Sequence, residues 1–176
     1  AGTTVYGFNS MVVSDPMGNW LKCFATVAVM VTLVYGRPYA ADRDMLRGGE
    51  MFTLSLFALL GMFIMISGNN FLVLYMGLEL LTLSSYALVA LRRDNATATE
   101  AAMKYFMLSI FSSALLLFGF SYLYGLAGTT NIPALLHTLN SQTSTNDIPL
   151  LAQVALIMVV AGLGFRITAV PFHFYA

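Results

Sequence analysis

Long apolar runs separated by short polar stretches divide this sequence. The clearest run is residues 70–91, NFLVLYMGLELLTLSSYALVAL, which is apolar for nearly its whole length. About 20 such residues suffice for a helix to cross the hydrocarbon core of a bilayer. Strands of an outer-membrane barrel would alternate apolar and polar positions instead. The pattern therefore predicts an all-α membrane protein, one transmembrane domain over residues 1–176, with about five spans at residues 17–35, 50–66, 70–91, 97–124 and 148–170.

Breaker and capping residues suggest where these helices begin and end. Pro16 suits a first helical turn, and Gly36, Arg37 and Pro38 are expected to end the first span. Thr97 with Glu100 three residues later has the pattern of a capping box. Pro171 removes a backbone hydrogen bond and is expected to break or kink the last helix.

The polar segments between the apolar runs, and some residues within the runs, also predict local structure. Residues 1–15 indicate an extramembrane lead-in, and residues 68–70 a tight, uncharged turn. Residues 132–139 form a short amphipathic pattern that is typical of a segment lying along the membrane interface. Small side chains that suit close helix contact gather in the fourth span, namely Ser109, Ser112, Ser113 and Ala114.

Composition supports the membrane assignment and excludes other classes. The chain is 59% hydrophobic and 9% charged, whereas soluble domains have about 25% charged residues. A net charge of zero argues against a nucleic-acid partner. The sequence has one cysteine and no phosphate-binding glycine loop, cysteine cluster or histidine pair at metal or haem spacing. We therefore expect no metal, cofactor or redox centre in this chain.

Charged loop residues predict the orientation. The loop after the first span has Arg37, Arg43 and Arg47, and the loop after the third has Arg92 and Arg93. Basic loops face the cytoplasm or matrix, so both are assigned to that side. The sequence begins at Ala1 without an initiator methionine or a visible signal peptide, and we expect it to be a piece of a longer polypeptide.

Three ionisable residues fall within the predicted spans: Glu79, Lys104 and Arg166. A charge at the bilayer centre costs roughly 3 kcal/mol on insertion scales, so it is seldom retained without a role. At 1.5 Å per residue, Glu79 lies about 14 Å from the outer end of its helix, Lys104 about 10 Å from the inner end, and Arg166 about 25 Å along its span. An acid facing two bases across adjacent helices makes buried charge tolerable.

Two roles remain open for these residues. Glu79 and Lys104 are either a structural ion pair that fixes helix register or elements of a proton relay, for which a buried lysine is suited. Arg166 does not suit proton exchange, because a guanidinium stays protonated. His173, two residues after Pro171, titrates near neutral pH and is either a relay or a hydrogen-bonded structural residue.

Three stretches resemble one known family: NNFLVLYMGLELLTLSSYALVAL, EAAMKYFMLSIFSSALLLFG and GLGFRITAVPFHFYA. They are similar to the antiporter-like membrane subunits of proton-translocating NADH:quinone oxidoreductase (respiratory complex I), and most of all to the subunit N (ND-two) type. The resemblance covers residues 15–176 and implies the third to seventh helices of a larger antiporter-like fold of about fourteen.

The resemblance implies roles and surroundings for the chain. Glu79 and Lys104 match the family's fifth-helix glutamate and sixth-helix lysine, and His173 matches a histidine after a helix break. Arg166 stands where the family usually has a lysine, which implies a fixed charge that tunes Glu79 while Lys104 or His173 switches. The expected partners are other membrane-arm subunits of the complex and the lipid bilayer. NADH, FMN, iron–sulfur clusters and quinone are expected in partner subunits. The expected location is a bacterial inner membrane, with the mitochondrial inner membrane as the alternative.

Two other functions remain open from sequence alone. The family is also similar to subunits of multisubunit cation/proton antiporters, which would use the same charges. A purely structural membrane scaffold would use Glu79 and Lys104 only as a register lock.

Overall fold

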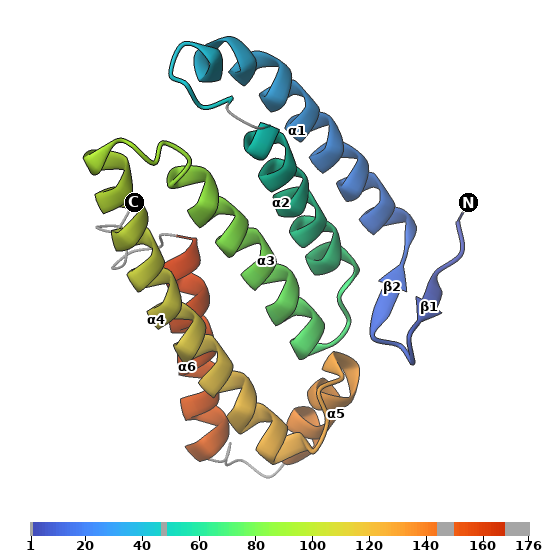
Figure 1. Cartoon of the computed structure of the whole chain (residues 1–176). Coiled ribbons are helices and arrows are strands. Elements are labelled where there is room, and N and C mark those ends of the chain that lie inside the picture. The colour runs from blue at the N-terminus through green and yellow to red at the C-terminus, as the bar shows by residue number, and fades with distance from the viewer. Residues whose placement is uncertain (1, 47–48, 144–149, 168–176) are drawn as a thin grey trace. The chain divides into compact units, whose positions relative to one another are not determined.

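The computed structural model describes residues 2–46, 49–143 and 150–167. In this part a β-hairpin precedes six helices (Figure 1). The chain forms two compact units: residues up to 68 with 73–104, and residues 69–72 with those from 105 onward. The elements in chain order are β1 (Val5–Gly7), β2 (Val12–Ser14), α1 (Pro16–Ala41), α2 (Glu50–Ser67), α3 (Phe71–Val89), α4 (Ala96–Ala127), α5 (Ile132–Thr143) and α6 (Leu150–Arg166).

The hairpin occupies the predicted lead-in, where no strand was expected. β1 and β2 pair antiparallel, with Tyr6 opposite Val13, and Val12 also forms a bridge with Gly68. Three successive residues in the turn, 8–10, have positive φ angles. Strands of three residues are too short to show an alternating apolar pattern, so the sequence carried little signal for them.

Helix α1 begins where the sequence predicted and ends later. The Asp15 carboxylate accepts a hydrogen bond of 2.9 Å from the Gly18 amide, and Pro16 occupies the first turn. The expected end at residues 36–38 is wrong, because α1 continues to Ala41 with Pro38 inside it. Pro38 removes one backbone donor close to the helix end, where the loss of a single hydrogen bond interrupts only the last turn.

In the first unit, α1, α2 and α3 lie side by side (Figure 1). The backbones of α2 and α3 approach each other closely at two buried glycines, Gly61 and Gly77. A Cβ atom added to Gly61 would lie 2.8 Å from the Leu81 amide nitrogen and 2.9 Å from the Gly77 carbonyl oxygen. Any side chain at position 61 would therefore force the two helices apart.

Helix α4 is capped by Asn95, not by the predicted Thr97. The Asn95 side-chain oxygen accepts a hydrogen bond of 3.0 Å from the Ala98 amide, which satisfies one of the free donors of the first turn. Thr97 lies inside the helix. Glu100 is bound by Lys104 instead of completing a capping box.

The second unit has a core where α4, α5 and α6 meet the start of α3. Its buried members are Phe71, Leu123, Leu135 and Ala155, and the rings of Phe71 and Phe120 stack at 4.8 Å. The predicted tight turn at residues 68–70 is tied to the segment before α5. There the Asn70 side-chain amide donates to the Thr130 hydroxyl at 2.7 Å, and the Phe71 amide donates to the Thr130 carbonyl at 3.0 Å.

The helical-bundle fold class expected from the sequence is confirmed. Four described helices, α1 to α4, are long and apolar enough to cross a membrane, and α6 is a shorter apolar helix. The predicted amphipathic segment is a helix, α5, which extends to Thr143. The expected break near Pro171 lies outside the described residues.

Candidate functional site

Glu79 lies half-buried near the middle of α3. Gly77, two residues earlier, contacts α2 through the close approach to Gly61. Because neighbours two apart on an α-helix are separated by about 200° around its axis, Glu79 lies on the face of α3 that is turned away from α2. The acid is thus retained in an apolar helix, on the face opposite the close approach of Gly61 and Gly77.

Small hydroxyl residues follow Glu79 along α3. Thr82 and Ser84 are buried, and their hydroxyls donate to the Leu78 and Leu80 carbonyls at 2.8 and 2.7 Å. Thr82 is three residues from Glu79 and therefore lies on a neighbouring position of the same face. Of the two hydroxyls only that of Thr82 lies beside the acid, because Ser84 is five residues from Glu79 and turned about 140° from it around the helix.

Lys104 forms an ion pair with an acid of its own helix. Its Nζ atom lies 2.6 Å from Glu100 Oε1, one turn earlier on α4. From sequence, an ion pair with Glu79 was one of the two roles left open for Lys104. Both side chains are largely exposed in this chain, with 71% and 66% of their surfaces accessible. Glu100 and Lys104 have the ordinary i,i+4 spacing of neighbours on a helix surface. Glu100 was assigned to a capping box from sequence, so this pair was not identified.

Arg166 ends α6 and is held by α4. Its guanidinium donates to the Ser113 hydroxyl. One turn earlier, the Ser112 hydroxyl donates to the Gly162 carbonyl at 2.9 Å, and this bond is buried. A Cβ atom on Gly162 would lie 3.0 Å from the Leu116 amide nitrogen. Glycine at this position allows α6 to approach α4 closely enough for Arg166 to reach Ser113.

The predicted helix contact of the small side chains in α4 is confirmed for two of the four, Ser112 and Ser113. Ser109, Ser112 and Ser113 are buried, and the last two bind α6. Ala114 is exposed, so its predicted participation is wrong. The sequence did not identify Ser113 as the partner of Arg166. Two features of the sequence could have identified it. Ser112 and Ser113 are adjacent small residues on α4, and Gly162 and Arg166 are one turn apart on α6, which suits close packing of the two helices.

The remaining predicted site residues are distributed as follows. Glu79 and Lys104 belong to the first unit and Arg166 to the second. His137 is exposed on α5. His173 lies outside the described residues. In the described ranges, no group of three His, Cys, Asp or Glu side chains could hold a metal ion.

Comparison with known proteins decides the family. The model of the transmembrane domain shared by NADH:quinone oxidoreductase and Mrp antiporters matches residues 68–176, well over half of the chain. The chain belongs to the NADH:quinone oxidoreductase/Mrp antiporter transmembrane family. The matched range contains Glu79, Lys104, Arg166 and His173, so every predicted relay residue lies within the family domain.

Curated relatives in this family are similar over nearly the whole chain. NADH-quinone oxidoreductase subunit N of Polaromonas naphthalenivorans is 63% identical over 174 residues, covering 99% of this chain and 34% of the relative. Subunit N of Herminiimonas arsenicoxydans is 50% identical over 178 residues, covering 99% and 35%. The chain thus spans about a third of the length of the curated relatives that it matches.

Solved structures of respiratory membrane complexes agree with the fold. Respiratory complex I from Thermus thermophilus with bound aureothin has a TM-score of 0.74 and 27% identity, covering 99% of this chain and 35% of that one. The membrane-bound sulfane sulfur reductase, an archaeal respiratory membrane complex, has a TM-score of 0.61 and 32% identity, covering 70% and 24%. The bundle is therefore a fragment of an antiporter-like fold, and this family member is a multi-pass protein of a bacterial inner membrane.

Proposed function

We propose that this chain is part of a proton-translocating membrane-arm subunit of a complex I-type NADH:quinone oxidoreductase. The curated relatives at up to 63% identity are named as subunit N of that enzyme. The observation that carries the proposal is Glu79. A half-buried carboxylate stands in an apolar, membrane-length helix of this family, on the face turned away from the α2 contact. A packing role would be served at lower cost by leucine.

In the proposed relay, Glu79 and Lys104 exchange protons and Arg166 supplies a fixed positive charge. A carboxylate and an amine can each take up and release a proton, whereas a guanidinium stays protonated. The bond from Arg166 to Ser113 holds that fixed charge against α4. His173 is the further candidate for proton transfer beyond Arg166.

The redox chemistry of such an enzyme would reside in other subunits. We infer that NADH, FMN, iron–sulfur clusters and quinone bind partner chains, and that this subunit contacts other membrane-arm subunits and lipid. The described residues offer no cluster of metal ligands. This chain would contribute the membrane path for protons and no electron-transfer group.

A multisubunit cation/proton antiporter is the second candidate, because the matching family model also covers Mrp antiporters. Copurification separates the two. The protein is isolated under mild conditions from its native membranes, and its partners are identified by mass spectrometry and by the electron paramagnetic resonance of iron–sulfur clusters. Iron–sulfur and NADH-oxidising partners support the proposal. An assembly that lacks them and exchanges cations for protons supports the antiporter.

A further inference from the structure

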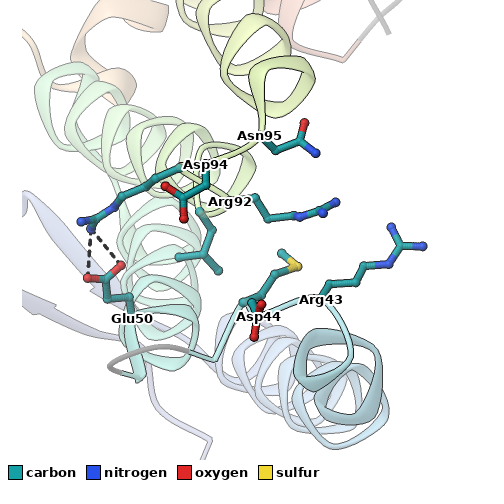
Figure 2. Close-up of a pocket in the computed structure, with 9 residues that line it drawn as sticks. Arg43, Asp44, Glu50, Arg92, Asp94 and Asn95 are labelled. Carbon is teal, nitrogen blue, oxygen red and sulfur yellow. Dashed lines mark hydrogen bonds and ion pairs between the residues drawn. The ribbon is translucent and has the colours of Figure 1, made fainter.

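A pocket of about 380 Å³ lies between two loops of the first unit (Figure 2). One loop follows α1 and contributes residues 43–45, the other follows α3 and contributes residues 91–95, and Glu50 at the start of α2 also lines the pocket. Basic loops face the cytoplasm. The pocket is therefore expected at the inner ends of the apolar helices, at the level of the lipid headgroups.

Three donor side chains of the pocket extend to the same side in Figure 2: Arg43, Arg92 and Asn95. Within the described residues, neither guanidinium forms an ion pair, although Arg43 lies 4.2 Å over the ring of Tyr39. The Asn95 side-chain oxygen caps α4, so its amide nitrogen supplies the remaining donors. This donor set offers planar N–H groups from two loops, an arrangement that suits a phosphate group.

The acids of the pocket have other contacts. The Arg93 Nη2 atom donates to both Glu50 carboxylate oxygens at 3.0 Å, and the other guanidinium nitrogens of Arg93 keep their donors. Asp44 and Asp94 each take part in other interactions of the chain, and their carboxylates lie to the left of the donor set in Figure 2. Three arginines and three acids make the formal charge of the lining zero. A phosphate would therefore be held by direct hydrogen bonds from the donor set, and not by the net charge of the pocket.

An apolar groove adjoins the charged pocket. It has a volume of about 410 Å³ and runs between α2 and α3, along Thr53, Leu54, Ala87 and Ala90. The pocket and the groove share three lining residues, Glu50, Leu91 and Arg93. A free phosphate ion would use the donor set alone, whereas a phospholipid of the inner leaflet has a phosphate and an apolar chain and would use both surfaces.

We propose that the pocket and the groove bind one phospholipid of the inner leaflet, whose phosphodiester is recognised by the donor set and whose acyl chain lies in the α2–α3 groove. A phosphate held by Arg43 and Arg92 links the loop after α1 to the loop after α3. The recognised group is the phosphodiester, so phosphatidylethanolamine and phosphatidylglycerol both fit. The site is independent of the proposed proton relay, because its donors lie at the ends of the helices and Glu79 lies near the middle of α3.

Photolabelling of the full-length protein in its native assembly tests this proposal. The assembly is stripped of lipid and returned to vesicles that contain a small fraction of phosphatidylglycerol or phosphatidylethanolamine with a diazirine in the acyl chain. Mass spectrometry then locates the labelled peptides. We expect both lipids to label the α2–α3 groove, and the Arg43→Gln/Arg92→Gln variant to show groove labelling about tenfold lower, which corresponds to about 1.4 kcal/mol. Diacylglycerol with the same chain lacks the phosphate and should label the groove of wild type as weakly.

Two single variants separate ligand binding from folding. Asn95→Asp retains a good helix cap and replaces the amide donors with a carboxylate, so groove labelling should fall while assembly and thermal stability stay unchanged. Arg37→Gln removes an exposed arginine near the end of α1 that does not line the pocket, and it should label like wild type.

Four results would overturn the proposal. Equal groove labelling in the double variant and in Arg37→Gln would show that the arginines of the pocket do not bind the lipid. Equal labelling by diacylglycerol would show that the phosphate is not recognised. Loss of labelling on addition of inorganic phosphate would assign the donor set to a free anion. A groove that neither phospholipid labels would mean that another protein segment covers it.

Discussion

The Ser112 hydroxyl on α4 donates a buried hydrogen bond of 2.9 Å to the Gly162 carbonyl on α6. This bond lies one helical turn before Arg166, whose guanidinium binds Ser113. A carbonyl inside a helix already accepts the amide four residues later, so the serine uses its second lone pair. Two adjacent hydroxyls of α4 thus fix both the approach of α6 and the position of its terminal charge.

Replacing Ser113 with alanine should leave the partly buried guanidinium of Arg166 short of an acceptor. Removing a hydrogen bond to a charged group typically costs about 1.5–3 kcal/mol, so we expect a lower thermal midpoint for the purified protein. Ser121→Ala is the matched control, because Ser121 is exposed on the same helix. If the two variants unfold at the same temperature, the Arg166–Ser113 bond does not hold α6.

Two glycines of α4 should respond in opposite ways to substitution by alanine, because Gly119 lies against α6 and Gly125 does not. A Cβ atom on Gly119 would lie 3.0 Å from both the Ala155 carbonyl oxygen and the Val159 amide nitrogen, whereas one on Gly125 would meet nothing within 4 Å. Overpacking of this kind costs about 1–3 kcal/mol. In an open helical position, Gly→Ala gains up to about 1 kcal/mol.

Thermal unfolding of the Gly119→Ala and Gly125→Ala variants therefore should shift in opposite directions. The helix and the substitution are the same in both, so intrinsic helix propensity cancels in the comparison. A Gly119→Ala protein as stable as Gly125→Ala would mean that the two helices are not in backbone contact at this level.

Lys104 and Glu100 should differ in their effect on proton transfer although they bind each other. Exposed i,i+4 pairs contribute little to stability, so Glu100→Gln should leave both assembly and proton pumping nearly unchanged. Lys104→Gln should reduce pumping, because the relay loses a group that can carry a proton. Proton uptake by membrane vesicles during NADH oxidation is the measurement. Equal pumping by the two variants would assign Lys104 to the surface pair alone.

The helix pattern could be predicted from sequence because hydropathy acts over whole segments. The run at residues 70–91 is apolar almost throughout and corresponds to α3, Phe71–Val89. The cap at Asp15 and Pro16 is also a local signal, and it is confirmed. By contrast, Pro38 did not end α1. A breaker near a helix end costs one hydrogen bond, and tertiary context decides whether the helix continues.

The specific contacts of the site could not be predicted in the same way. The Ser109–Ser113 region indicated close helix packing, but the partner helix follows only from the position of Gly162 and Arg166 in space. The predicted Glu79–Lys104 pair was inferred from depth alone, and depth does not specify the direction of a side chain around its helix. Lys104 instead pairs with Glu100, which the i,i+4 spacing places beside it on its own helix.

The central claim is that the Glu79 carboxylate carries protons, and Glu79→Gln tests it most directly. Glutamine keeps the size and hydrogen-bonding capacity of the side chain and removes its charge change. In membrane vesicles with a normally assembled enzyme, we expect NADH-driven proton pumping to fall strongly, with Glu100→Gln as the matched control. Full pumping by the Glu79→Gln enzyme would contradict the account.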